Sequence, residues 1–140
     1  MRRRIVLALA ALALLAPAPA ALAETVKLAA DLSGRNEVPP HDGTASGKAE
    51  MTLDTETLTF TWSVSYSGLS GPAIGAHIHG PVHAGNNAGI MIPFPTTDNP
   101  IAGSMKITEA QARDILAGLT YVNIHTKEHP GGEIRGQLTR

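Results

Sequence analysis

Apolar and polar residues alternate along most of the chain after residue 23. Between residues 58 and 66, Thr and Ser alternate with five larger apolar residues: Leu58, Phe60, Trp62, Val64 and Tyr66. Successive side chains of a β-strand point to opposite faces, so this pattern predicts a strand with one buried face and one wet face. The segment before it alternates in the same way, and a turn over residues 54–57 would join the two as an antiparallel hairpin.

Six further segments have strand patterns and bring the expected number of strands to about eight: 25–32, 73–79, 90–94, 101–107, 121–126 and 133–139. One short helix is expected after Thr108, because Thr108 and Gln111 have capping-box spacing and Gly118 can end the helix. This combination predicts an all-β fold, a Greek-key antiparallel sandwich or flattened barrel. The stretch 81–100, rich in Gly, Asn and Pro, is predicted to be a long surface loop with at most one short strand.

The first 23 residues have a different composition. Three arginines at positions 2–4 precede a twelve-residue apolar run over 5–16, two prolines and the sequence Ala21-Leu22-Ala23. This pattern is typical of a bacterial secretory signal, with cleavage after Ala23. The run is shorter than the roughly 20 residues of a membrane-spanning helix. We therefore expect a signal peptide over 1–23, one domain over 24–140, a periplasmic or secreted location, and no membrane attachment after cleavage.

Charge and cysteine content exclude several classes of function. Without the leader, eight Lys and Arg stand against 12 Asp and Glu, which gives a net charge of −4. An acidic domain is not expected to bind nucleic acid. The chain has no cysteine, so thiol chemistry is excluded, and an exported domain without disulfides must rely on its core or on a bound metal. Oligomeric state is not indicated by the sequence.

Histidine offers the clearest candidate chemistry. His77 and His79 lie two residues apart in the predicted strand 73–79, so both imidazoles project from one face. In the strand 121–126, Val122 and Ile124 are expected to face the core, which turns His125 outward as well. These three histidines form a candidate metal site on the outer face of the sheet; the alternative is a set of solvated surface histidines.

The choice of metal follows from the ligand type. Imidazole ligands in an oxidising compartment favour copper, with zinc as the second candidate, whereas calcium requires a cluster of oxygen ligands. His41, His83 and His129 are the candidates for a fourth ligand. Each lies in a loop rich in Pro or Gly, where a solvated histidine is the alternative.

The hairpin formed by the last two strands can be aligned from its apolar residues. Ile134 and Leu138 must share the inner face with the apolar residues of 121–126, which favours a five-residue loop over 128–132. This register pairs Lys127 with Glu133, His125 with Arg135, and Asn123 with Gln137. Arg135 would then lie beside His125 or else be a solvated surface charge, and Lys127 with Glu133 would form an exposed ion pair.

Four ordered motifs resemble the CHRD domain, which is named for its occurrence in chordin: Asn36-Glu37-Val38-Pro39-Pro40, Ala76-His77-Ile78-His79-Gly80-Pro81, Tyr121-Val122-Asn123-Ile124-His125-Thr126 and Gly132-Glu133-Ile134-Arg135-Gly136-Gln137. The resemblance covers residues 28–138. In animals such domains belong to extracellular proteins that bind growth factors, and bacterial members are mostly small exported proteins. The resemblance therefore implies an exported β domain without fixing its function.

A more distant resemblance concerns the pair His77 and His79. It is similar to the His-Val-His copper ligands of copper-zinc superoxide dismutases, which are Greek-key barrels with a later histidine ligand and an active-site arginine. By this analogy His77, His79 and His125 would bind copper, and Arg135 would guide the superoxide anion. The chain lacks the disulfide and the histidine-rich zinc loop of those enzymes, so the analogy implies copper only. Because the net charge repels superoxide, local cations such as Arg135 and Lys127 would have to attract it.

The leading prediction is thus an exported copper-binding domain that acts as a superoxide dismutase and converts superoxide to oxygen and hydrogen peroxide. The first alternative is a non-catalytic periplasmic copper carrier or store that meets a copper-delivering partner. The second alternative is a metal-free extracellular module that binds another protein.

Overall fold

The computed structural model describes residues 24–140, and the predicted signal peptide over 1–23 lies outside the described residues. Eight strands, one short 3-10 helix and one α-helix follow one another in this order: β1 (Thr25–Ser33), η1 (Gly34–Asn36), β2 (Ser46–Asp54), β3 (Thr59–Ser67), β4 (Ala73–His79), β5 (Ile90–Pro93), β6 (Ile101–Lys106), α1 (Glu109–Leu116), β7 (Tyr121–Thr126) and β8 (Ile134–Gln137). Every predicted strand is present, with ends that differ by no more than two residues.

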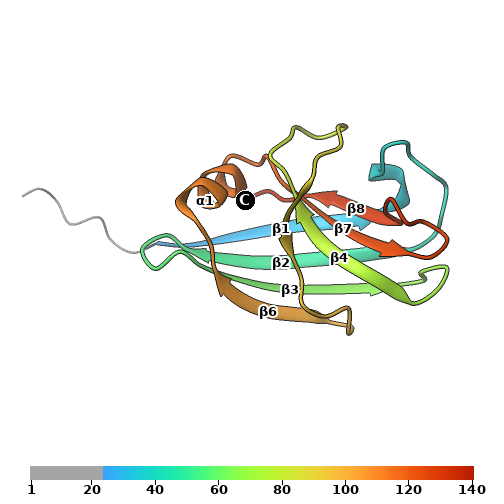
Figure 1. Ribbon diagram of the computed structural model, residues 1–140, viewed down its shortest axis with the longest axis horizontal. Helices are drawn as coiled ribbons and strands as arrows, with labels where there is room; N and C mark the ends of the chain where they lie inside the picture. The colour runs from blue at the N-terminus through green and yellow to red at the C-terminus, as the bar shows by residue number, and fades with distance from the viewer. Residues whose placement is uncertain (1–23) are drawn as a thin grey trace, which may run out of the picture.

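The strands form a single antiparallel sheet that curls around its own inner face (Figure 1). Their order across the sheet is β5-β4-β7-β8-β1-β2-β3-β6. The connections β3–β4 and β5–β6 each pass from one part of the sheet to a distant one, whereas β1, β2 and β3 are joined as neighbours. This arrangement confirms the predicted all-β fold of the flattened-barrel type.

The core lies on the inner face of the curled sheet. Phe60, Val64, Val122 and Ile124 are fully buried there, as their alternation with polar residues predicts. Each such side chain contributes about 1.5–3 kcal/mol by leaving water. Trp62 of β3 stacks on the ring of the residue just after β5, Phe94, with ring centroids 5.0 Å apart, so side chains from opposite ends of the sheet meet inside.

Helix α1 begins as predicted. The Thr108 hydroxyl accepts a hydrogen bond of 3.1 Å from the Gln111 backbone N–H, and the Gln111 side chain accepts one of 2.9 Å from the Thr108 N–H. These reciprocal bonds satisfy two amide groups that the first turn of a helix leaves without partners. The helix ends at Leu116, and Gly118 follows with a φ of 72°. Within residues 24–140, no helix has both the length and the apolar character needed to cross a membrane.

The register of the β7–β8 hairpin differs from the predicted one by two residues. Asn123 pairs with Arg135, and Tyr121 pairs with Gln137, so Arg135 is not opposite His125. The inner face is nevertheless as predicted, because a shift of two residues preserves the alternation of faces. The loop between the two strands, residues 127–133, is longer than expected, and Glu133 at its end is buried rather than exposed. Its two carboxylate oxygens accept hydrogen bonds from other residues, and it forms no ion pair with Lys127.

The outer face of β7 is covered rather than exposed. The loop after β4 and the segment that contains η1 both rise on this side of the sheet (Figure 1). Asn87 in the loop after β4 donates a hydrogen bond of 3.1 Å to the carbonyl of Val38, which follows η1, so the two covering segments are joined to each other. Tyr121, Asn123 and His125 therefore face outward, as predicted, yet remain 3%, 2% and 9% exposed.

Candidate metal centre

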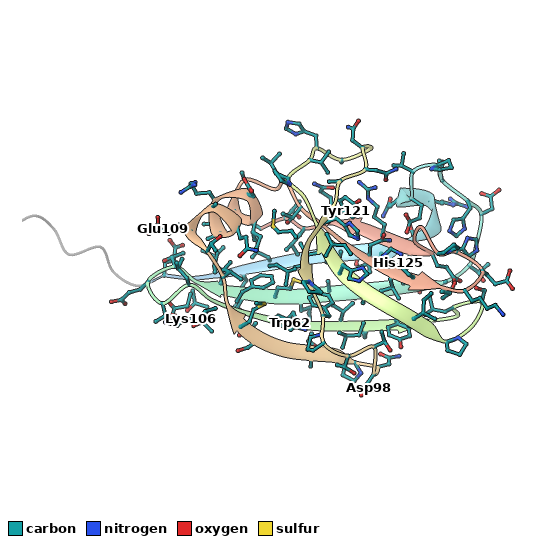
Figure 2. All side chains as sticks on the ribbon, in the orientation of Figure 1. Trp62, Asp98, Lys106, Glu109, Tyr121 and His125 are labelled. Atoms are coloured by element: carbon teal, nitrogen blue, oxygen red, sulfur yellow. The ribbon has the colours of Figure 1, made fainter. Side chains whose placement is uncertain are left out.

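Three histidines from two neighbouring strands converge on the covered outer face. β4 contributes His77 and His79. β7 contributes His125, labelled in Figure 2, and this residue pairs with Gly75 of β4. One nitrogen of each ring lies within 4.8 Å of the others. Among residues 24–140 this is the only group of three or more His, Cys, Asp or Glu residues whose ligand atoms come close enough to hold one ion.

The spacing between two of the rings suits direct coordination. His77 Nδ1 and His125 Nε2 are 3.1 Å apart. Two imidazole nitrogens that each lie about 2.0–2.1 Å from one metal ion and 3.1 Å from each other subtend roughly 100° at that ion. This angle is compatible with tetrahedral or square-planar coordination.

Backbone carbonyls orient two of the three imidazoles. His79 Nδ1 donates a hydrogen bond of 3.0 Å to the Ala88 carbonyl, and His125 Nδ1 donates one of 3.0 Å to the Pro130 carbonyl. A carbonyl can only accept, so both rings carry their proton on Nδ1 and present the Nε2 lone pair to the centre. This second interaction of a ligand ring is typical of metal-binding histidines.

His79 Nε2 is buried and has no hydrogen-bond partner among the described residues. A buried acceptor without a partner normally destabilises a protein by about 1–3 kcal/mol. A metal ion bound between the three rings would satisfy this atom. The residues present therefore fit a metal ion bound through one nitrogen of each histidine.

The surroundings keep these imidazoles neutral. Burial lowers the pKa of His77 to about 4, and the adjacent His125 and His79 contribute to the same shift. Burial also lowers the pKa of His79 and of His125, although the hydrogen bonds to Ala88 and Pro130 partly oppose the effect. Neutral imidazole is the form that binds metal, so no imidazolium has to lose its charge before binding at neutral pH. Because His125 carries its proton on Nδ1, His77 Nδ1 donates to His125 Nε2 in the metal-free protein, and a bound ion would replace this hydrogen bond.

A glycine makes room for the His77 ring. A Cβ atom at Gly75 would lie 3.2 Å from His77 Cε1 and 3.5 Å from His77 Nε2. The first of these distances is tighter than ordinary van der Waals contact. The absence of a side chain at Gly75 thus lets the His77 ring lie back along β4 with Nδ1 directed towards His125.

Arg135 lies behind a tyrosine ring rather than at the histidines. The strand order places Tyr121 of β7 between His79 of β4 and Arg135 of β8. The Tyr121 ring stacks on His79 with centroids 4.9 Å apart, and the Arg135 guanidinium carbon lies 3.4 Å from the centroid of the same ring. Arg135 is only 2% exposed, and it donates hydrogen bonds to Asn86 and Asn87.

The other three histidines lie outside the group. His41 donates from Nε2 to the Glu133 carbonyl at 2.8 Å and accepts at Nδ1 from the Gly43 N–H at 3.1 Å, so both of its nitrogens are occupied. His129 stacks on His41 with centroids 4.4 Å apart, and His83 lies on the loop after β4. The structure brings none of the three candidate fourth ligands to the group.

Two carboxyl groups, those of Glu37 and Glu133, are buried, and neither role was predicted. Burial raises the pKa of Glu37 to about 7, although a hydrogen bond from Asn123 and the charges of Arg135 and His41 lower it. The sequence signal for Glu37 was its place between Asn36 and two prolines in a CHRD-like motif.

Glu133 corrects the prediction of an exposed ion pair. It is 3% exposed, and its two oxygens accept hydrogen bonds from the Ser70 N–H at 2.7 Å, the Ser70 hydroxyl at 2.8 Å and the Thr126 hydroxyl. Burial alone would raise the pKa of Glu133, but these hydrogen bonds more than compensate and lower it. Glu133 therefore ties the end of β7 to the segment that precedes β4.

The model of the CHRD domain matches residues 28–138, nearly all of the described chain. The protein belongs to the CHRD domain family. Searches of curated proteins and of solved structures find no match. Membership identifies an extracellular-type β domain, and the three converging histidines of this CHRD domain lie within the matched residues.

Proposed function

We propose that this CHRD domain is an exported copper protein and that it acts as a copper-only superoxide dismutase. The observation that carries the proposal is the convergence of His77, His79 and His125, with two of the rings held in the tautomer that presents Nε2. The location would be the periplasm or the cell exterior, in agreement with the extracellular occurrence of the family and with the leader-like residues 1–23.

The donor set favours copper. Three imidazoles with no carboxylate in the group suit copper or zinc and do not suit calcium or magnesium. Bound copper would supply one-electron chemistry, by which two superoxide anions and two protons give oxygen and hydrogen peroxide. Zinc has no such redox chemistry, so zinc bound at this site would not support dismutation.

The protein's own contribution is to hold the ligands and to limit access. His79 and His125 are nearly buried, and His77 is more exposed, so a small anion would approach on the side of His77. The net charge of −4 over residues 24–140 opposes that approach at long range, so we expect the reaction rate to rise when salt screens the repulsion.

Copper binding is tested by titration of the copper-free protein. We expect one Cu(II) per chain, with nitrogen hyperfine coupling in the electron paramagnetic resonance spectrum. The variant in which His77, His79 and His125 are all replaced by Gln should lose this stoichiometric binding. His83→Gln, which removes a histidine of the loop after β4 that lies outside the group, is the matched control and should bind copper as the wild type does.

Two results would decide against parts of the proposal. If the triple variant keeps the wild-type stoichiometry, the three histidines are not the ligands. If the copper-loaded protein consumes superoxide no faster than an equal amount of free copper, the domain is not a dismutase, and the copper carrier becomes the better interpretation.

A further inference from the structure

Three residues of the loop after β4 lie across the outer face of the sheet beside the candidate metal centre. We name residues 86–88 the strap. The strap touches β4, β7 and β8 through hydrogen bonds, although the loop around it is largely exposed. Its position is therefore set by a few specific contacts rather than by burial of apolar side chains.

Arg135 makes the first of these contacts. Its Nη1 donates to Asn87 Oδ1 at 2.9 Å, and its Nη2 donates to the Asn86 carbonyl. The planar guanidinium thus holds two acceptors of the strap at once while it lies over the Tyr121 ring. A lysine ammonium cannot reproduce both the fork of donors and the stacking.

Tyr121 makes the second contact. Its hydroxyl donates to the Ala88 carbonyl at 3.3 Å and accepts from the Ala88 N–H at 3.2 Å. Because Arg135 packs on one face of the Tyr121 ring, it stabilises this contact as well. Arg135 thus holds the two residues that precede Ala88, and Tyr121 holds the backbone of Ala88 itself.

The Ala88 carbonyl is the acceptor that fixes the His79 ring. If it moved away, His79 Nδ1 would lose its hydrogen-bond acceptor at 3.0 Å, and the proton would no longer be confined to Nδ1. The Nε2 lone pair would then be presented to the metal only part of the time. The His125 ring would be unaffected, because its acceptor is Pro130 in a different loop.

From these contacts we propose that Arg135 is a positioning residue: it holds the strap so that the Ala88 carbonyl keeps His79 ready to bind metal. This inference rests on the proposed metal site. It assigns Arg135 a role different from that of a guide for superoxide, which requires a guanidinium accessible to the anion. Arg135 is 2% exposed, and Tyr121 separates it from the histidines.

The test uses ¹⁵N nuclear magnetic resonance of the imidazoles in the copper-free protein, together with copper affinity. In the wild type, both His79 and His125 should show the Nδ1–H tautomer. Arg135→Lys should give a mixture of tautomers at His79 only and weaken copper binding about tenfold, which is typical of losing a group that supports a metal ligand. An unchanged ¹⁵N signal of His125 is the internal control, because it shows that the fold of the variant is intact.

Asn87→Ala provides a second variant if Arg135→Lys does not fold, because Asn87 is exposed and its side chain is the acceptor for Arg135. It should shift the His79 tautomer in the same direction. Asn86→Ala is the matched control, since Asn86 accepts from Arg135 through its backbone carbonyl, and it should resemble the wild type.

Wild-type tautomers and copper affinity in both Arg135→Lys and Asn87→Ala would overturn the inference. If in addition superoxide consumption alone fell, and fell less at high salt, Arg135 would act on the anion instead. The tautomer is measured without metal, so a failure of wild-type protein to bind copper would refute the proposed function without obscuring this result.

Discussion

Replacement of Glu37 by Gln should change the stability of the copper-free domain in a pH-dependent way. Glu37 is 7% exposed, and its Oε1 accepts a hydrogen bond of 2.6 Å from Asn123. Arg135 and His41 are the charged groups that act on it. Burial outweighs these interactions and raises its pKa from 4.5 to about 7.

The sign of the effect follows from proton binding. Between pH 4.5 and about 7 the folded chain keeps a proton on Glu37 that the unfolded chain has released, so this group's contribution to stability falls as the pH rises. At about 1.36 kcal/mol per pK unit, its ionisation destabilises the folded state by about 0.8 kcal/mol at pH 5 and about 3.3 kcal/mol at pH 8. A glutamine side chain at this position cannot ionise and retains an oxygen that accepts from Asn123.

We therefore expect the free energy of unfolding of Glu37→Gln, relative to that of wild type, to increase by about 2.5 kcal/mol between pH 5 and pH 8. Urea denaturation of both proteins at several pH values measures this difference. Contributions of the histidines that do not interact with Glu37 are common to both chains and cancel, and the coupling of Glu37 to His41 is part of the measured difference. Glu128→Gln, at an exposed position, controls for the removal of one negative charge. A difference that stays constant within about 0.5 kcal/mol would show that Glu37 is not held in the buried, protonated state.

Two further substitutions test local features. Gly75→Ala should push the His77 ring aside and weaken copper binding about tenfold in a copper titration. Gly71→Ala is the control and should bind copper as the wild type does, because a Cβ atom there meets nothing within 4 Å. Equal affinities of the two variants would show that Gly75 does not determine the position of the His77 ring. Thr108→Ala should lower the free energy of unfolding by about 1 kcal/mol in urea denaturation, because the first turn of α1 loses its cap, and an unchanged value would mean that the capping box contributes little.

The orientation of the three histidines was predictable because it depends only on the alternation of side chains along a strand. The apolar residues Ile78, Val122 and Ile124 identify the inner face, and their neighbours in the sequence must then point outward. The same rule could not give the pairing of β7 with β8, since registers that differ by two residues bury the same side chains. The hydrogen bonds that Glu133 makes in the observed register carry no periodic signal either.

The groups that orient the imidazole rings could not be predicted from the sequence, for a different reason. The acceptors of His79 and His125 are backbone carbonyls, and every residue has one. Their position depends on the path of two irregular loops, which no pattern of residue types describes. The covering of the outer face has the same origin, so Tyr121 and Arg135 were expected to be more accessible than they are.

In β4 and β7, alternate positions serve different purposes: one face packs in the core, and the other carries the candidate metal ligands. Even-numbered residues such as Ile78, Val122 and Ile124 fill the interior, whereas the odd-numbered histidines beside them lie on the outer face and are not part of the apolar core. Donor atoms can therefore be exchanged at these odd positions without repacking a single interior side chain. This makes the pair of strands a framework for engineering altered coordination chemistry, in which the interior stays the same and only the contacts of the covered outer face change.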